Sequence, residues 1–279
     1  MVSQEQRRRQ LAREKFLRQQ QRRTSARRKA RVRNSVIASV LGVILIGSVA
    51  LYTTDALKGD DSKENASSEV TPSASASAAA EDPCEKPAGG EVKKLSYDKE
   101  PELTVDKSAT YTMDLQTTCG DISIAMDASK APHTVNSFDF LVGKGYLDHT
   151  KCHRLTTAGI YVLQCGDPEG TGMGGPGYTI PDENLKDERL KGDTYPAGTV
   201  AMANQYNAQT DEGRDSGGSQ FFLVYQDSQL PANYTPFGTI SDSGMEVLKK
   251  IADAGENSGM GDGAPNATVV IDKATVAKS

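Results

Sequence analysis

A run of residues without charge, from Asn34 to Thr54, divides this chain into parts that cannot share one fold. Its length is close to the roughly 20 residues that an α-helix needs to cross a bilayer. Before it, residues 1–34 carry thirteen Lys and Arg against two Glu, whereas the whole chain has a net charge of −5. A basic flank is expected to stay cytoplasmic. We therefore predict a basic cytoplasmic arm (1–34), a transmembrane helix (35–54) and a C-terminal part outside the cytoplasm.

Two other interpretations of this N-terminal region stay open. Ser48–Ala50 is typical of a signal-peptidase site, so the apolar segment can also be a cleaved export signal. The basic arm can alternatively bind nucleic acid, because runs of Lys and Arg attract phosphate. We favour a retained anchor, since a 34-residue basic lead is long for a signal peptide. The arm is then expected to contact anionic lipid headgroups, with no nucleic-acid partner.

The segment after the apolar run offers little that can be buried. Residues 55–104 include charged residues at 58–61 and a Ser/Ala-rich run at 71–80. Such composition predicts a flexible linker. The remaining residues, 105–279, are enough for one domain with a substantial core, which we expect to be a monomer.

Short alternating apolar segments dominate residues 105–279. Residues 111–115 and 122–126 alternate and flank Cys119-Gly120-Asp121, which indicates a hairpin. Further strand-like runs occur at 155–163, 200–203, 221–225 and 268–271.

Helical spacing of apolar residues occurs over two segments. Val135, Phe138, Leu141 and Val142 predict a helix over 134–143, which Pro132 can begin and Gly143 can end. Inward-facing Val247, Leu248 and Ile251 predict a second helix over 244–254, with Gly255 as its stop. Many short strands with two helices predict a mostly β domain, a closed antiparallel barrel capped by helices.

Four cysteines permit two disulfides in any of three pairings: Cys84, Cys119, Cys152 and Cys165. If Ala158-Gly159 turns a hairpin, Cys152 and Cys165 lie opposite one another and within reach of a bond. Two buried thiols are the alternative. The pairing stays open at this point.

Three catalytic patterns are present only in part. The stretch Gly170–Gly175 spells G-x-G-x-x-G, but the prolines that follow forbid the helix that a nucleotide site needs. Cys152 and His153 are adjacent on an expected strand and point to opposite faces, so they cannot share a metal ion. Ser219 lacks the setting of a hydrolase nucleophile. We therefore expect neither a metal nor a cofactor.

Four blocks between residues 152 and 222 each place a committed polar side chain among small or apolar neighbours, as a pre-formed peptide-binding face would. They are Cys152-His153-Arg154, Gln164-Cys165-Gly166-Asp167, Ala201-Met202-Ala203-Asn204 and Gly217-Gly218-Ser219-Gln220-Phe221-Phe222. None supplies a nucleophile beside a base. The pattern points to chemistry by one fixed cation, Arg154, beside a dry pocket.

In this order the blocks resemble the cyclophilins, a family of peptidyl-prolyl cis–trans isomerases. The resemblance runs from about residue 110 to 276 and includes 130–138, the glycine-rich stretch, Asp182-Glu183-Asn184, Pro236-Phe237-Gly238 and Gly244-Met245. The whole chain is most similar to membrane-anchored bacterial members. The resemblance implies a closed eight-stranded barrel with two helices.

The resemblance also implies a role for each site residue. Arg154 would hydrogen-bond to the prolyl nitrogen during rotation of an Xaa-Pro bond, and Gln164 would orient it. The residues expected to bind the proline-containing substrate are Tyr161, Val162, Ala203, Asn204, Gln205, Gln220, Phe222, Leu230 and Tyr234. The partners implied are exported polypeptides in the course of folding.

Several positions depart from the common pattern of the family. Tyr161 and Val162 stand where phenylalanine and methionine are usual, and two extra residues precede them within 155–160. Leu230 stands where many members carry a tryptophan that contacts cyclosporin, which predicts weak inhibition by that drug. Tyr234 falls where histidine is common.

These departures leave two hypotheses for the domain and one for the arm. The first is an anchored prolyl isomerase, which the retained Arg154 favours. The alternative is a non-catalytic module that binds proline-containing peptides, which the altered pocket favours. A third hypothesis makes the arm and linker the working part.

Overall fold

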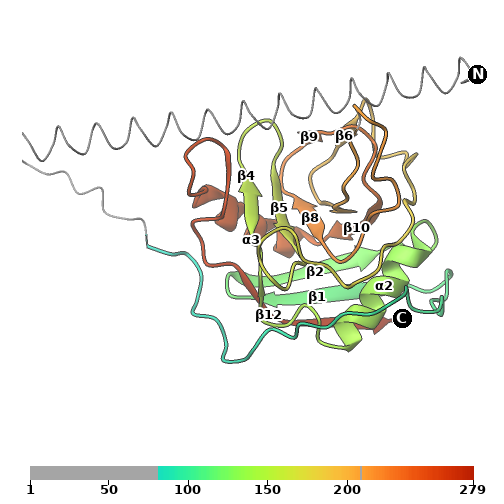
Figure 1. The fold of residues 1–279 in the computed structure, drawn as a ribbon. Coiled ribbons are helices and arrows are strands. Elements are labelled where there is room, and N and C mark those ends of the chain that lie inside the picture. The colour runs from blue at the N-terminus through green and yellow to red at the C-terminus, as the bar shows by residue number, and fades with distance from the viewer. Residues whose placement is uncertain (1–80, 208) are drawn as a thin grey trace, which may run out of the picture. The chain divides into compact units, whose positions relative to one another are not determined.

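A hairpin of two long strands, β1 (Tyr111–Thr117) and β2 (Gly120–Met126), begins the sheet of the domain. The computed structural model describes residues 81–207 and 209–279 (Figure 1). The register runs from Tyr111 opposite Met126 to Thr117 opposite Gly120, which leaves a two-residue turn. Alternate side chains of both strands are buried, so this hairpin confirms the sequence prediction: Tyr111, Met113, Leu115, Ile122, Ile124 and Met126.

The main sheet holds ten antiparallel strands in the order β11-β4-β5-β8-β7-β10-β2-β1-β12-β3. The other eight are β3 (Thr150–Lys151), β4 (Arg154–Thr156), β5 (Val162–Cys165), β7 (Thr199–Met202), β8 (Phe221–Val224), β10 (Pro236–Ile240), β11 (Asp262–Gly263) and β12 (Val270–Lys278). A separate pair joins β6 (Thr194–Tyr195) to β9 (Ser228–Gln229).

This sheet is a curled half-barrel, so the expected closed eight-stranded barrel is wrong. Its edge strands are β11 and β3, each of two residues, and no strand pairing joins them within residues 81–207 and 209–279. The chain passes from β3 to β4 through Cys152 and His153, where the ladder breaks and the His153 amide donates to the Gln164 carbonyl at 3.1 Å. Edge strands of two residues are too short to continue the hydrogen-bonded ladder across the gap between β3 and β11.

Two helices pack on the sheet. Helix α2 (Pro132–Gly143) begins at its proline, as predicted, and buries the four apolar residues expected to face inward. Phe138 of α2 stacks on Phe237 at a centroid distance of 4.9 Å. Helix α3 (Asp242–Asp253) is capped by Ser241, whose hydroxyl accepts from the Gly244 amide at 3.1 Å. It buries Leu248 and Ile251 and ends before Gly255, which has a φ of +73°.

The predicted strand over 155–163 is two strands. Arg154 pairs with Gln164 and Leu155 with Leu163, so β4 and β5 form a hairpin whose loop carries Gly159 at a φ of +78°. The turn is centred on Gly159 rather than between residues 158 and 159, a shift of half a residue from the expected register.

Part of the predicted linker packs against the domain. Within residues 81–104, the Tyr97 amide donates to the Pro176 carbonyl at 2.8 Å, and its ring meets Phe140 of α2 at 4.9 Å. The Thr104 amide donates to the Asn136 side chain at 2.8 Å. Through these contacts, residues 81–104 cover one side of α2 (Figure 1). Composition alone predicts a linker for this segment. The predicted arm (1–34), the predicted membrane helix (35–54) and residues 55–80 lie outside the described residues.

None of the helices formed by residues 81–207 and 209–279 combines the length and the apolar character that a membrane crossing requires.

All four cysteines form disulfides, Cys84 with Cys119 and Cys152 with Cys165. The first ties the segment before β1 to the β1–β2 turn. The second joins the chain just before β4 to the last residue of β5, which is the cross-strand pairing that the hairpin argument suggested.

Candidate active site

The Arg154 guanidinium is held on two sides at the start of β4. Its Nε and Nη2 donate to the two carboxylate oxygens of Asp262 at 2.7 and 2.8 Å, and its Nη1 donates to Gln164 Oε1 at 3.2 Å. The hydrogen bonds that Arg154 donates to Asp262 raise the pKa of Arg154 further above its ordinary value. Arginine carries five N–H donors. Three are committed here, so one hydrogen on each terminal nitrogen remains for a ligand.

A line of amide side chains extends from Arg154 across neighbouring strands. Gln164 lies opposite Arg154 on β5, and its Nε2 donates to Gln220 Oε1 at 2.9 Å. Gln220, just before β8, donates in turn to the Gly174 carbonyl at 2.8 Å. Because each oxygen accepts from the previous residue, the orientation of every amide in the line is set by Arg154 at one end and by the glycine-rich loop at the other.

An apolar pocket of about 200 Å³ opens beside this line. Its walls are Arg154, Ile160, Val162, Gln164, Ala203, Asn204, Phe222, Leu230 and Tyr234. Val162 and Phe222 belong to a small apolar cluster of their own, apart from the main core. The pocket therefore combines one cation, Arg154, and two amides, Gln164 and Asn204, with mostly apolar walls, which suits a small apolar ring next to polar groups.

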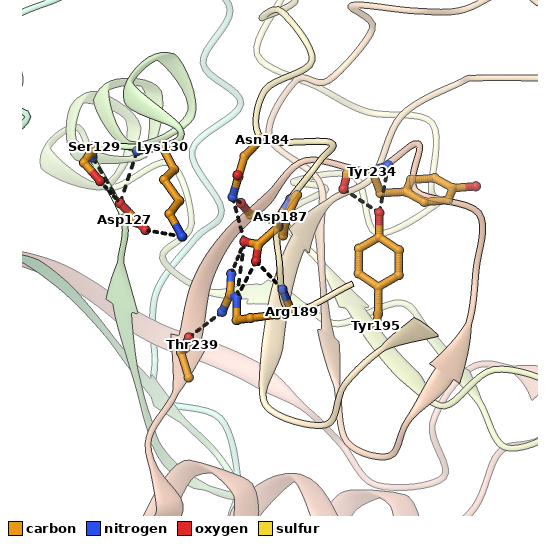
Figure 2. A network of polar contacts seen from close by, with 10 residues as sticks. Asp127, Ser129, Lys130, Asn184, Asp187, Arg189, Tyr195, Tyr234 and Thr239 are labelled. Atoms are coloured by element: carbon orange, nitrogen blue, oxygen red, sulfur yellow. Dashed lines mark hydrogen bonds and ion pairs between the residues drawn. The ribbon is translucent and has the colours of Figure 1, made fainter. Parts of the chain in front are cut away.

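Two tyrosines fix the wall of the pocket from behind. Tyr195 is fully buried, its hydroxyl donates to the Tyr234 carbonyl at 2.7 Å and accepts from the Tyr234 amide at 3.1 Å (Figure 2). The Tyr234 ring meets the Phe222 ring edge-on at 5.6 Å. Burial raises the pKa of Tyr195 well above its ordinary value, so this hydroxyl keeps its proton.

Each residue of Asp182-Glu183-Asn184 contacts a different neighbouring segment. Asp182 accepts from the Asn204 side chain at 3.3 Å. Glu183 caps α2 by accepting from the backbone amides of His133 and Thr134 at 3.1 and 2.9 Å. Asn184 donates to Asp187 at 2.8 Å.

Asp187 and Arg189 complete this support (Figure 2). The Asp187 side chain is fully buried and accepts from Arg189 Nη2 at 2.8 Å, while Arg189 Nη1 donates to Thr239 on β10 at 2.8 Å. Burial alone would raise the pKa of Asp187, but the Arg189 and Asn184 hydrogen bonds outweigh it and hold that pKa far below its ordinary value. The segment that leads to β6 and β7 is thus fastened to the sheet.

A larger groove of about 790 Å³ lies on the other side of Gln164, Ala203 and Asn204. Its walls come from residues 172–179, 203–205, 216 and 218–220 together with Gln164. Gln205, predicted to bind substrate, lies in this groove and not in the apolar pocket.

The glycine-rich loop folds around a carboxylate of its own chain. Asp167 is fully buried and accepts from the backbone amides of Glu169, Thr171 and Gly172 at 2.7, 2.9 and 2.6 Å. Burial would raise the pKa of Asp167, but these amides lower it below its ordinary value. Donors that a nucleotide phosphate would need are therefore already used. The buried Asp167 carboxylate therefore holds the glycine-rich loop, and with it this wall of the groove, in place.

Of the other two partial patterns, Ser219 has a structural role and Cys152 forms a disulfide. Ser219 is fully buried, and its hydroxyl donates to the Gly166 carbonyl at 2.7 Å. Gly166 has a φ of +89°, and a Cβ there would lie 2.1 Å from the Ser219 carbonyl oxygen, so only glycine fits. Among residues 81–207 and 209–279, no group of three or more His, Cys, Asp or Glu side chains is placed to hold a metal ion.

The structure brings ten of the eleven predicted residues to the pocket or the groove beside it. The exception is Tyr161, whose ring packs edge-on against Tyr225 at 5.9 Å while the preceding Ile160 lines the pocket. The longer β4–β5 loop accounts for this displacement. Sequence reasoning also missed Asp262, which lies 108 residues from Arg154 and outside every motif. No local pattern marks it.

The fold and the pocket together define a cyclophilin-like domain. Residues 112–276 match the family described as cyclophilin type peptidyl-prolyl cis-trans isomerase/CLD. This match spans more than half of the chain, and the chain belongs to that family.

Individual relatives agree with this assignment. A probable peptidyl-prolyl cis-trans isomerase B from Mycobacterium leprae (strain TN) is 46% identical over 172 residues, which cover 59% of this chain and 56% of that protein. Peptidyl-prolyl cis-trans isomerase B from Bacillus subtilis (strain 168) is 38% identical over 123 residues, covering 44% of this chain and 76% of that protein. The chain thus spans little more than half the length of the mycobacterial relative.

A crystal structure of a cyclophilin type peptidyl-prolyl cis-trans isomerase from Cryptosporidium parvum is similar with a TM-score of 0.49 and 26% sequence identity. The similarity covers 61% of this chain and 99% of that one.

Proposed function

We propose that this protein catalyses cis–trans isomerisation of Xaa-Pro bonds in polypeptides that fold outside the cytoplasm. The observation that carries the proposal is the Arg154 guanidinium at the rim of the apolar pocket, with two N–H donors uncommitted. Family membership supports the same reaction, since the relatives are named for it.

The barrier to this reaction lies in the amide bond itself. Rotation about a peptide bond faces a barrier of about 18–20 kcal/mol because resonance makes the bond planar. An Xaa-Pro bond prefers trans by only about 0.5–1 kcal/mol, yet it exchanges over tens to hundreds of seconds. The lone pair of the prolyl nitrogen is delocalised in both planar states and becomes available only when the bond is twisted.

Arg154 suits a catalyst that acts on that difference. A donor placed at the prolyl nitrogen bonds to the twisted state better than to either planar state, which lowers the barrier by differential binding. Arginine stays protonated at every physiological pH, so no proton needs to be transferred. Hydrogen bonds to Asp262 and Gln164 fix the guanidinium plane before a substrate arrives.

The pocket supplies the remaining requirements. Val162, Phe222 and Leu230 form an apolar surface for the proline ring. The Ala203 amide already donates to the Gln220 carbonyl at 3.0 Å, so its carbonyl oxygen is the group that accepts from a bound peptide. With the ring seated and the peptide held, the bond preceding proline can rotate under Arg154.

The test compares wild-type full chain with the Arg154→Ala variant in a protease-coupled isomerisation assay, with proline-peptide binding measured in parallel. We expect kcat/KM to fall by about 10²–10³-fold, the typical cost of removing one transition-state donor. Binding should persist, since the apolar walls remain. Unchanged catalysis in the variant would contradict the arginine mechanism, and absence of catalysis in the wild type with binding intact would favour the binding-module alternative.

We also propose that residues 35–54 anchor the protein in the membrane with the domain on the outer side. The two disulfides support export, because disulfides persist in oxidising compartments and are rare in the cytosol. Protease added to intact cells should digest the domain, and intact-mass measurement should give the full chain. A measured mass that corresponds to a chain beginning after residue 50 would show that the segment is a cleaved signal instead.

A further inference from the structure

We propose that Asp262 is a positioning residue for catalysis, holding the Arg154 guanidinium in one orientation at the pocket. This inference rests on the proposed isomerase function. It concerns a residue outside the blocks that define the site in sequence.

The geometry selects which guanidinium hydrogens can reach a ligand. Asp262 takes the Nε edge through two hydrogen bonds, at 2.7 and 2.8 Å, the paired arrangement that fixes both the position and the plane of the group. Gln164 takes one hydrogen of Nη1. The two hydrogens left belong to Nη1 and Nη2, at the end of the side chain. Without Asp262, rotation about the last side-chain torsions would spread those hydrogens over many directions.

The loop that carries Asp262 is itself tightly organised. The Glu256 carboxylate accepts from the amides of Ser258 and Gly261 at 2.6 and 2.8 Å. The Asn257 amide donates to the Ala264 carbonyl at 2.9 Å, and the Ala264 amide donates back to the Asn257 side chain at 3.0 Å. A ring of short-range bonds thus closes the loop on itself.

The same loop is fastened to β4 beside Arg154. Asp262 and Gly263 pair with Thr156 and Leu155, and the Thr157 amide donates to the Gly261 carbonyl at 2.9 Å. A Cβ on Gly263 would lie 2.2 Å from Glu256 Oε2, so the glycine lets the two parts of the loop close together. Asp262 therefore stands on a rigid support, as positioning of a catalytic group requires.

The solvent exposure of both side chains indicates that the Arg154–Asp262 ion pair contributes more to the geometry of the site than to the stability of the fold. The Arg154 and Asp262 side chains are 38% and 57% exposed. Ion pairs between exposed groups contribute little to the free energy of unfolding. Substitution of Asp262 is thus expected to leave the fold intact and to act on Arg154.

The experiment measures kcat and KM of the full chain as wild type, Asp262→Ala, Asp262→Asn and a control, Asp106→Ala. Asp106 also pairs with a cation, Lys278, on the surface and outside the pocket. We expect kcat to fall about tenfold in Asp262→Ala and less in Asp262→Asn, which keeps one acceptor, with KM nearly unchanged. The kcat and KM of the control Asp106→Ala should stay close to the wild-type values. The thermal midpoints of all three variants should also match that of the wild type.

A spectroscopic readout separates positioning from a general structural effect. In ¹⁵N-labelled protein, the Arg154 Nε–H signal, assigned by its loss in Arg154→Lys, should exchange with water about tenfold faster in Asp262→Ala. A fall in kcat without faster exchange, or with a lowered thermal midpoint, overturns the positioning role. So does unchanged or raised kcat.

Failure of this inference can be told apart from failure of the proposed function. If Arg154→Ala retains full activity, the isomerase mechanism itself is wrong, whatever the Asp262 variants do. If Arg154→Ala is inactive while Asp262→Ala matches the wild type in kcat and exchange, only the role of Asp262 is refuted.

Discussion

Arg154 and Gln164 face one another across the β4–β5 ladder, and the guanidinium Nη1 donates to the glutamine Oε1 at 3.2 Å. Gln164 in turn donates to Gln220, so its own amide cannot turn freely. The contact is a property of the strand register and does not depend on a flexible loop. The contact therefore connects the Arg154 guanidinium to the line of amides formed by Gln164 and Gln220.

Replacing Gln164 with alanine should therefore disturb Arg154 without removing it. We expect kcat/KM to fall about tenfold, since small displacements of a catalytic group cost that much or more. The matched control is Gln116→Ala, an exposed glutamine on β1 away from the pocket. Equal activity in both variants would show that the amide line plays no part in catalysis.

The Cys152–Cys165 disulfide joins the chain just before β4 to the last residue of β5, and these two strands carry this pair. Its replacement by two alanines should lower the free energy of unfolding by about 3 kcal/mol, the typical value for a loop of this size, and should also reduce kcat/KM. Denaturant unfolding and the coupled assay measure the two effects.

The Cys84–Cys119 disulfide provides the comparison, because it spans 35 residues and lies away from the pocket. Its removal should cost at least as much stability while kcat/KM is retained. If both double variants lose activity equally, the Cys152–Cys165 bond has no special relation to the site.

Acid should weaken the domain through Asp187. Its pKa is depressed in the folded state, so the stability it contributes is complete above its ordinary pKa of about 4 and is lost as pH falls toward the folded value. Asp187→Asn should lower the free energy of unfolding at pH 7 by about 2–3 kcal/mol. Urea titrations between about pH 6 and 2 should show a shallower loss in the variant, and parallel curves would contradict the assignment.

Leu230 makes the pocket a test of drug recognition. It lines the pocket where many cyclophilins carry a tryptophan, so we expect weak inhibition of the wild type by cyclosporin. Leu230→Trp should strengthen inhibition about tenfold or more through added aromatic contact. Nanomolar inhibition of the unmodified protein would contradict this prediction.

Local sequence pattern was sufficient for the elements whose signals are local. Alternation located the β1–β2 hairpin, and apolar spacing with Pro132 and Gly255 bounded the two helices closely. The blocks around Arg154 and Gln220 marked the site because each lies on or beside a strand that points one side chain at the pocket.

Features that depend on distant contacts escaped prediction. Asp262 meets Arg154 only because β11 pairs with β4, which no pattern near either residue reveals. The sheet stays open between β3 and β11 because these edge strands have only two residues each, a length that the sequence pattern did not predict. Ile160 replaced Tyr161 because the length of a loop, and not its composition, decides which side chain enters the pocket.

The central claim is that a fixed guanidinium eases rotation of a prolyl amide, and catalysed exchange at equilibrium tests it most directly. NMR exchange spectroscopy on a short Xaa-Pro peptide would be recorded with substoichiometric full chain, wild type or Arg154→Lys. Lysine keeps the charge but loses the planar fork of donors. The account predicts rapid cis–trans exchange with the wild type and at least about a tenfold loss with Arg154→Lys, while peptide binding persists. Equal exchange rates for the two proteins would contradict it.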